Sequence, residues 1–318
     1  MICKVCGNSE SNKEFQIREM MFGFRDEFTY FECSECGCLQ IAEIPKDMEK
    51  YYPSNYYSFK KGESNNFIKQ ILIRKRDEYT LLKKGLIGKA LYIKYPNLLF
   101  DMISKMGVNY NSRILDVGCG AGNLLYSLNE TGFTDLMGVD PYMDRDDVDG
   151  NVTILKKTIH ELPDGQKFDL ITSNHSFEHI PDQLETLSKI SKILSENGVC
   201  LIRMPVKTKC IWNRYSVDWV QIDAPRHFFL HTLKSFELLV EKSGLSIQDV
   251  IFDSTEFQFW GSESYKRDVP LTAENSYSVN PKKSIFASKQ IREFRKMANE
   301  LNKNKQGDQA GFYLTRKK

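Results

Sequence analysis

Between residues 112 and 253, short apolar runs alternate with segments in which apolar residues recur every three or four positions. The short runs have the length of buried strands, and the longer period is typical of amphipathic helices. We expect strands over 114–117, 136–140, 152–155, 168–173, 198–204 and 246–252, and helices over 123–130, 182–194 and 233–241. Strands that alternate with helices predict an α/β fold whose parallel sheet is covered on both faces.

The N-terminal third of the chain has two further patterns. Apolar and polar residues alternate over 15–18 and 28–32, as they do in hairpin strands. From 66 to 106 the period is helical, and an apolar face is formed by Phe67, Ile71, Leu72, Leu81 and Leu82. Three residues that disfavour helix interrupt this stretch, namely Gly85, Gly88 and Pro96. The pattern predicts a helical cap of about three pieces laid against the core.

The C-terminal part predicts a basic amphipathic helix over 281–304, whose apolar residues are Ile285, Phe286, Ile291, Phe294 and Met297. A last strand over 311–315 would run antiparallel and complete a seven-stranded sheet. We therefore expect four parts, with an N-terminal module over 1–44, an aromatic linker and helical cap over 45–110, a core over 111–253 and an extension over 254–318.

Composition narrows the class of protein. The chain has 318 residues with 41% hydrophobic and 27% charged residues, which is typical of a soluble protein of about two domains. A net charge of +2 gives no reason to expect a nucleic-acid partner. No uncharged apolar run approaches the length of a membrane span, and the first residues lack a signal-peptide pattern, so a cytoplasmic location is expected.

Five of the eight cysteines fall within the first 38 residues. Cys3 and Cys6 form one C-x-x-C pair, Cys33 and Cys36 form another, and each pair is followed by glycine. This spacing lets both thiolates of a pair face one ion, and two such pairs predict a closed, structural Cys₄ zinc site of the zinc-ribbon type. Cys38 is a spare thiol that competes with Cys36 as the fourth ligand.

A glycine-rich turn follows the first expected core strand. Gly118, Gly120 and Gly122 come directly after the apolar run that contains Asp116, and a helical segment follows them. Glycine lets backbone N–H groups approach a ligand closely. Asp140 ends the next strand, where an acidic side chain usually bonds the ribose hydroxyls. The unit therefore predicts a nucleoside-binding βαβ motif.

The spacing favours a cationic nucleoside over a dinucleotide. The third glycine comes one residue early for G-x-G-x-x-G, and Asn123 takes its place. A carboxylate at Asp116 would repel a pyrophosphate but suits S-adenosylmethionine (SAM), which is a cation without phosphate. The segment 115–122 resembles the first motif of class I SAM-dependent methyltransferases. The first set of expected SAM-binding residues is Asp116, Gly118, Cys119, Gly120, Gly122, Asn123, Asp140 and Pro141.

The resemblance implies two further SAM contacts. In that family the loop after the third strand lines the adenine, which here assigns Ile159 and His160. The loop after the fourth strand faces both SAM and the acceptor, which implies a SAM contact for Asn174.

The same loop carries three further polar residues, His175, Glu178 and His179, of which His175 and Glu178 are expected to contact the acceptor. The pattern His175-x-x-Glu178-His179 also matches a metalloprotease signature. That signature needs a full helix, whereas Pro181 follows His179 by two residues. A divalent ion that joins Glu178 and His179 to a substrate remains an alternative.

A second loop, after the fifth strand, carries Arg226 and His227. A hydroxyl acceptor has to lose a proton, and histidine titrates near neutral pH. His227 is the first candidate for the base and His179 the second. Arg226 would hold an anionic group of the acceptor, or else pair with Asp223. Tyr56, from the tyrosine-rich segment 51–59, is a further candidate for acceptor contact.

The whole chain resembles the zinc-ribbon methyltransferases associated with bacterial sugar and surface-polysaccharide biosynthesis. The likeness covers both cysteine pairs, segments 51–59 and 115–122, the residues Glu178-His179 and Arg226-His227, and the late segments 260–263 and 307–310. Related sugar C-methyltransferases have a Glu-His pair where this chain has Arg226-His227. The resemblance therefore implies O-methylation of a sugar or glycan intermediate, such as a nucleotide-linked sugar.

Three alternatives stay open. The acceptor would be a small aromatic or quinone-like molecule in the first, and a sugar carbon in the second. In the third, the chain would be a binding module whose SAM fold is idle. The sequence leaves the oligomeric state undetermined.

Overall fold

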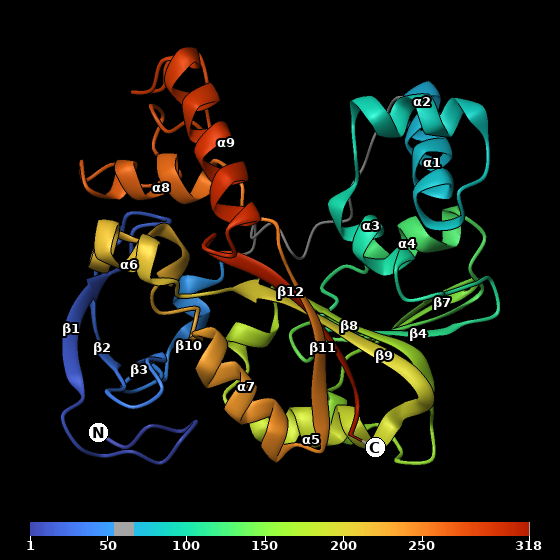
Figure 1. The fold of residues 1–318 in the computed structure, drawn as a ribbon, viewed down its shortest axis with the longest axis horizontal. Helices are drawn as coiled ribbons and strands as arrows, with labels where there is room; N and C mark the ends of the chain where they lie inside the picture. The colour runs from blue at the N-terminus through green and yellow to red at the C-terminus, as the bar shows by residue number, and fades with distance from the viewer. Residues whose placement is uncertain (54–66, 318) are drawn as a thin grey trace.

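This computed structural model describes residues 1–53 and 67–317, and its centre is an eight-stranded sheet (Figure 1). In chain order the strands are β4 (Arg113–Val117), β5 (Asp135–Val139), β6 (Asp147–Asp149), β7 (Val152–Leu155), β8 (Phe168–Asn174), β9 (Leu194–Pro205), β11 (Leu245–Phe252) and β12 (Gln309–Arg316). All of the strands expected from the apolar runs are present. The structure confirms the predicted α/β fold.

The order across the sheet is β11-β12-β9-β8-β4-β5-β7-β6. β4 lies in the middle and pairs in parallel with β5 and β8, so the ends of these three strands meet at one edge. β12 runs antiparallel to both β9 and β11, as predicted for the last strand. β6 was not predicted, because its sequence Asp-Val-Asp at an exposed sheet edge carries no apolar signal.

Helices cover both faces of this sheet (Figure 1). On one face α3 (Leu98–Ser104) and α4 (Asn123–Glu130) share an apolar cluster with β4, and on the other α5 (Gln183–Ile193) and α7 (Leu233–Lys242) share a second cluster with β8 and β9. The helices α4, α5 and α7 were expected within one or two residues of these bounds. The two clusters make the core that holds the strand ends in place.

The cap consists of α1 (Phe67–Leu82), α2 (Leu86–Lys94) and α3. It contacts the core through α3 and the end of α1, where Leu81 is buried, while Phe67 is 73% exposed. Of the apolar face predicted for α1, Leu81 is therefore buried, whereas Ile71 and Leu72 are 41% and 40% exposed. Gly88 does not break a helix: it lies within α2, where a Cβ atom would come within 2.2 Å of the Lys75 carbonyl oxygen.

The N-terminal module is joined to the core by a shared sheet. Its strands β1 (Lys13–Arg18), β2 (Glu27–Glu32) and β3 (Leu39–Ile41) continue into β10 (Phe229–Leu230), which pairs antiparallel with β3. The sequence predicted the hairpin but took 228–231 for a loop. Because β10 begins two residues after His227, this sheet helps to fix the position of that residue.

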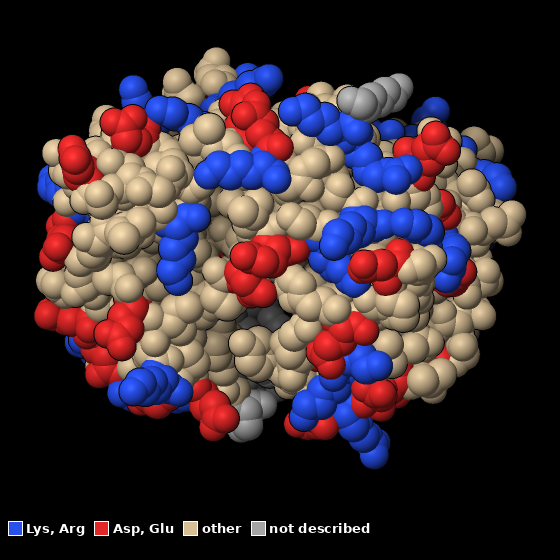
Figure 2. Space-filling view, turned by 90° about the horizontal axis from the view of Figure 1, so that it is seen from below, with Lys and Arg blue, Asp and Glu red and all other residues tan. Residues whose placement is uncertain are grey.

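The C-terminal extension contains α8 (Phe257–Tyr265) and α9 (Ser288–Lys303), and the short helix α6 (Lys209–Tyr215) lies between β9 and β10. α9 begins seven residues later than the predicted 281. Ile291 and Phe294 are buried as expected, whereas Ile285 and Met297 are 40% and 37% exposed. On the face shown in Figure 2, basic and acidic side chains are interspersed. Within the described ranges, the structure contains no helix of the length and apolarity that crossing a bilayer requires.

Candidate functional site

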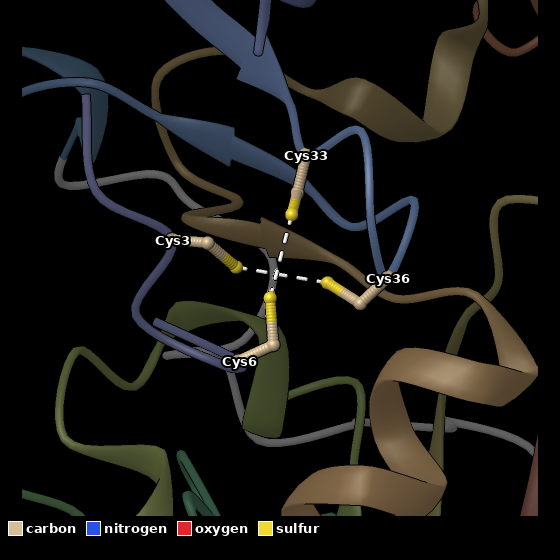
Figure 3. Close-up of side chains that lie close together, drawn as sticks. All are labelled: Cys3, Cys6, Cys33 and Cys36. Carbon is tan, nitrogen blue, oxygen red and sulfur yellow. Dashed lines mark hydrogen bonds between the residues drawn. The ribbon is translucent and has the colours of Figure 1, made fainter. Parts of the chain in front are cut away.

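The four paired cysteines converge on one point in the N-terminal module (Figure 3). The Cys3 and Cys36 sulfurs lie 3.6 Å apart and those of Cys6 and Cys33 lie 3.5 Å apart. A tetrahedral zinc ion with Zn–S bonds of about 2.3 Å would hold its sulfurs about 3.8 Å apart, so the cluster fits zinc closely. Cys38 lies outside this cluster, 3.9 Å from Nδ1 of His231. With four sulfur ligands and no open position, such a site is structural.

The glycine-rich turn lies between the end of β4 and α4. Gly118, Gly120 and Gly122 have φ of 72°, 50° and 76°, where glycine is favoured. A Cβ atom on Gly118 would lie 2.4 Å from the Ser176 side chain, and one on Gly122 would lie 2.3 Å from Ile154. The turn is therefore pressed against the loop after β8, and its backbone is the part available to a ligand.

Two carboxylates flank this turn. Asp140, at the end of β5, accepts hydrogen bonds from the backbone N–H groups of Gly120 and Tyr142, each at 2.9 Å. A carboxylate has lone pairs for further donors, so it can also accept ribose hydroxyls. Asp116 is buried, and burial raises its pKa to about 7 although the Thr172 hydroxyl opposes this at 2.7 Å. Burial likewise raises the pKa of Asp140. A buried pair of carboxylates suits a cationic ligand.

The other residues predicted to bind SAM differ in how far they are buried and in their hydrogen-bond partners. Cys119 is half-buried, Asn123 and Pro141 are exposed, and Asn174 accepts a hydrogen bond from Arg203 at 3.0 Å. Ile159 is buried in the core at the start of a short 3-10 helix (Ile159–Glu161). His160 is exposed, and its Nε2 lies 3.0 Å from a carboxylate oxygen of Asp182. SAM contacts for these residues stay predictions.

A cavity of about 310 Å³, named here the acceptor pocket, lies beside the loop after β8. It is lined by Met21, His175, His179, Val220, Gln221, Asp223, His227, Phe257, Leu271 and Gln309. The loop that carries Ser176 against Gly118 also carries His175 and His179 into this lining. One loop thus connects the glycine-rich turn with the acceptor pocket.

Backbone carbonyl groups orient the two histidines that were predicted as bases. Nδ1 of His227 lies 2.7 Å from the Gln221 carbonyl oxygen, and Nδ1 of His179 lies 2.8 Å from that of Arg226. A carbonyl oxygen only accepts, so each Nδ1 carries the proton and each Nε2 of a neutral ring has a free lone pair. Burial, aided by His227, lowers the pKa of His179 to about 4, so its ring is neutral at pH 7.

Glu178 lies behind these histidines in a 3-10 helix (Phe177–His179) and is fully buried. Its Oε1 is 3.8 Å from Nε2 of His227 and 3.5 Å from Nδ1 of His175. Burial would raise the pKa of Glu178, but His175 and the other two histidines outweigh it and lower this pKa to about 2. Glu178 is not among the residues that line the pocket, and its contact with the acceptor stays a prediction.

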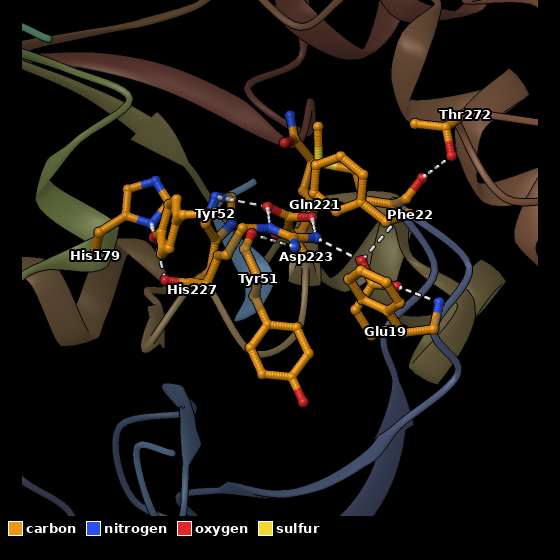
Figure 4. Close-up of polar contacts among 12 residues, drawn as sticks. Glu19, Phe22, Tyr51, Tyr52, His179, Gln221, Asp223, His227 and Thr272 are labelled. Carbon is orange, nitrogen blue, oxygen red and sulfur yellow. Dashed lines mark hydrogen bonds and ion pairs between the residues drawn. The ribbon is translucent and has the colours of Figure 1, made fainter. Parts of the chain in front are cut away.

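Arg226 pairs with two carboxylates inside the protein, those of Glu19 and Asp223, which are labelled in Figure 4. Its guanidinium is fully buried and pairs with Glu19 of the N-terminal module at 3.0 Å and with Asp223 at 2.6 Å. It also donates to the Tyr51 carbonyl oxygen. Because all of its charge is used inside the protein, Arg226 does not hold an anionic acceptor. It ties the N-terminal module to the pocket wall, and of the two predicted alternatives the pairing with Asp223 is correct.

Several lining residues were not predicted. Asp223 stood in the loop already singled out, four residues before His227, and its carboxylate lies 3.8 Å from Nε2 of that ring. Met21 belongs to the N-terminal module, and no local pattern connects it with a pocket. Tyr52 places its hydroxyl 3.2 Å from Nδ1 of His179. Tyr56 lies outside the described residues.

Comparisons with known proteins match this chain to a methyltransferase family model, to curated relatives and to solved structures. A family model described as "Methyltransferase domain" matches residues 92–250. The ubiquinone biosynthesis O-methyltransferase of Rickettsia bellii is 26% identical over 175 residues, which cover 49% of this chain and 72% of that protein. The protein of the same name from Vibrio vulnificus is 29% identical over 119 residues, 35% of this chain and 51% of that one. The cyclopropane synthase MmaA2 from Mycobacterium tuberculosis has a TM-score of 0.43 at 14% identity, and covers 80% of this chain and 99% of its own.

Proposed function

Since the chain belongs to the methyltransferase domain family and is a SAM-dependent methyltransferase, we propose that it methylates a hydroxyl oxygen of a small sugar or glycan intermediate. SAM would be held by the glycine-rich turn with Asp116 and Asp140, and the acceptor would lie in the acceptor pocket. Zinc bound by the four cysteines would stabilise the N-terminal module and take no part in the reaction.

The lining of the acceptor pocket carries this proposal. Six of its residues have polar side chains, namely His175, His179, Gln221, Asp223, His227 and Gln309. Several polar groups around one cavity suit a ring with many hydroxyl groups, because each buried hydroxyl needs a partner. Phe257 also lines the pocket, and the flat face of its ring suits the apolar side of a sugar ring.

Nε2 of His227 is the group that we propose takes the proton of the acceptor hydroxyl. The Gln221 carbonyl fixes the tautomer, and the carboxylates of Glu178 and Asp223, each 3.8 Å away, would stabilise the imidazolium that forms. SAM supplies an electrophilic methyl group: a C–O bond forms, the C–S bond breaks, and the sulfur keeps the electron pair. His179 is the second candidate for the same role.

A quinone-like or catechol acceptor is the second candidate function. It is supported by two curated relatives, which are O-methyltransferases of ubiquinone biosynthesis at 26% and 29% identity. The same histidine would deprotonate a phenol more easily than a sugar hydroxyl, because a phenol has a pKa of about 10.

The test is transfer of a labelled methyl group from SAM to a panel of nucleotide sugars, free sugars and catechols, followed by identification of the methylated atom. Label in an ether oxygen of a sugar is the expected result. Label on a catechol would move the assignment to the second candidate. Label on carbon, or SAM binding without transfer to any hydroxyl compound, would overturn both.

A further inference from the structure

Three side chains meet at the wall of the acceptor pocket, with Glu178 behind the two histidines that line it, in an arrangement that a general base does not require. Glu178, His179 and His227 each offer one ligand atom, and these atoms lie within 4.8 Å of one another. The two imidazole rings are 4.7 Å apart between centroids and stand at 74° to each other. They come from two loops, one after β8 and one before β10, so the fold brings them together over a sequence separation of 48 residues.

The three groups offer lone pairs to one another and no proton. The backbone carbonyls of Arg226 and Gln221 use the Nδ1 protons of His179 and His227, which leaves both Nε2 atoms as acceptors. The Glu178 carboxylate has only acceptors as well. Groups that all accept do not hydrogen-bond with one another, so a cation between them would satisfy all three at once.

The Glu178 carboxylate is the strongest indication that a cation binds here. Both oxygens of Glu178 are buried and neither has a hydrogen-bond partner among the described residues. His175 lies 3.5 Å from Oε1, close enough for attraction but without hydrogen-bond geometry. An ionised carboxylate in such surroundings is costly unless a cation accompanies it. Two oriented imidazoles beside it are the ligands that a divalent transition metal prefers.

We propose that Glu178, His179 and His227 form a second metal site, which binds a divalent transition metal such as Mn²⁺, Fe²⁺ or Zn²⁺. Two histidines and one carboxylate occupy one face of such an ion and leave its other positions open. Metal–ligand distances of about 2.1 Å separate neighbouring ligands by about 3.0 to 3.4 Å, so the three side chains would close by about 1 Å. The carbonyl groups on each Nδ1 are the outer hydrogen bonds that orient metal-bound histidines.

This site deepens the proposed function and rests on it. His179 and His227 line the acceptor pocket, so an ion that they hold would be reached from it and would bind the reacting hydroxyl together with a neighbouring oxygen of a vicinal diol or catechol. Both histidine lone pairs are then committed to the ion. The bound hydroxyl therefore loses its proton to water and not to His227, and the resulting oxygen attacks the methyl carbon as before.

The test uses the full chain, with its structural zinc verified by elemental analysis after weakly bound metals have been removed. Mn²⁺ is the probe, because it binds thiolates poorly and so leaves the cysteine cluster alone. Binding is followed by electron paramagnetic resonance. We expect a single bound Mn²⁺ per chain, and an affinity about tenfold or more lower in Glu178→Gln. Glu256→Gln, which removes a carboxylate paired with Arg295 elsewhere, is the matched control and should bind like the wild type.

Circular dichroism establishes that Glu178→Gln is folded, and methyl transfer with and without added Mn²⁺ completes the experiment. Absence of Mn²⁺ binding, or equal binding by Glu178→Gln and wild type, would overturn the metal site. Full methylation by the metal-depleted protein would overturn the metal's part in the reaction and leave the proposed function, with His227 as base, intact. Mn²⁺ bound through Glu178 without methylation of any hydroxyl compound would support the site and overturn the proposed acceptor class.

Discussion

Two residues on the wall of the acceptor pocket adopt unusual backbone angles. His175 has φ of 52° and Asp223 has φ of 43°, in the left-handed region that side chains other than glycine rarely occupy. Each is held by its neighbours: the His175 N–H donates to the Arg203 carbonyl at 2.8 Å, and the Asp223 carboxylate pairs with Arg226. Backbone strain that the surrounding structure enforces is common at functional sites. His175, 3.5 Å from Glu178, and Asp223, 3.8 Å from His227, are thus held in strained backbone conformations.

Asp116 gives a prediction about pH. Its pKa of about 7 means that it is largely protonated below pH 7. A cationic ligand favours the ionised form, so binding below pH 7 must first remove this proton. Affinity for SAM should be full above pH 7 and fall by up to about tenfold per pH unit below it. Calorimetric titrations between pH 5.5 and 8 would measure this.

The matched variant for that series is Asp116→Asn, which has no charge to lose. Its SAM affinity should be low and change less with pH, and any slope that remains belongs to Asp140 and other groups. The same slope in wild type and Asp116→Asn would show that Asp116 does not face the ligand.

His227 gives the second prediction at this scale. Replacing it with alanine should lower kcat about 10²-fold or more, whether its Nε2 takes a proton or binds a metal. SAM affinity should stay close to that of the wild type, because the ring lines the acceptor pocket and not the glycine-rich turn. Steady-state kinetics with the best acceptor, together with SAM calorimetry, separate these two quantities. Undiminished turnover would move the role to His179.

At the scale of elements, a buried ion pair connects the loop before β10 with the N-terminal module. Arg226→Met would leave Glu19 and Asp223 without their common cation, and Glu19 is itself 0% exposed. Breaking one partner of such a pair costs about 3 to 5 kcal/mol of unfolding free energy. Urea denaturation should show this loss, and Glu19→Gln in the same chain should recover part of it.

The control for Arg226 is an exposed pair on α9. Lys303 and Glu300 have side chains that are 71% and 65% exposed, so Lys303→Ala should change stability by less than about 1 kcal/mol. If Arg226→Met were as mild as Lys303→Ala, the loop would not depend on its ion pair.

Helix packing within the cap gives another prediction. A Cβ atom on Gly88 would overlap the Lys75 carbonyl of α1, which is backbone and has little freedom to move. Gly88→Ala should therefore destabilise the cap by about 1 to 3 kcal/mol, in spite of the better helix propensity of alanine. Gly165→Ala is the control, since its Cβ atom would meet nothing within 4 Å. Thermal unfolding of the two variants makes the comparison, and equal midpoints would contradict the close packing.

At the scale of the whole molecule, the N-terminal module contacts the wall of the acceptor pocket although no cysteine of the cluster lines the cavity. Met21 and Glu19 belong to the same module as the cysteines, and β3 pairs with β10 beside His227. Removal of zinc by a strong chelator should loosen this sheet and abolish methyl transfer. SAM affinity should persist, because the glycine-rich turn lies in the core. Retained turnover after verified zinc loss would show that the module is dispensable.

The sequence predicted what depends on local pattern and could not predict what depends on distant packing. The strands β4, β5, β7 and β8 are buried apolar runs, and the cysteine spacing is a local signal, so both were found. The pairing of Arg226 with nearby Asp223 was one of two predicted alternatives, whereas its second partner, Glu19, was not predicted because it lies 207 residues away in the sequence. Gly88 was wrongly predicted to break a helix. In a sequence, a glycine that allows two helices to approach closely cannot be told from a glycine that ends a helix.

The pairing of β3 with β10 limits how this protein can be recombined. A ribbon transplanted from a relative would have to reproduce the edge geometry of β3, a carboxylate that reaches Arg226, and a side chain in the place of Met21. Chimeras made by cutting near residue 44 should therefore lose turnover even when both halves come from active enzymes. A change of acceptor would then evolve through matched substitutions in the N-terminal module and in the loop before β10, and not through exchange of one module.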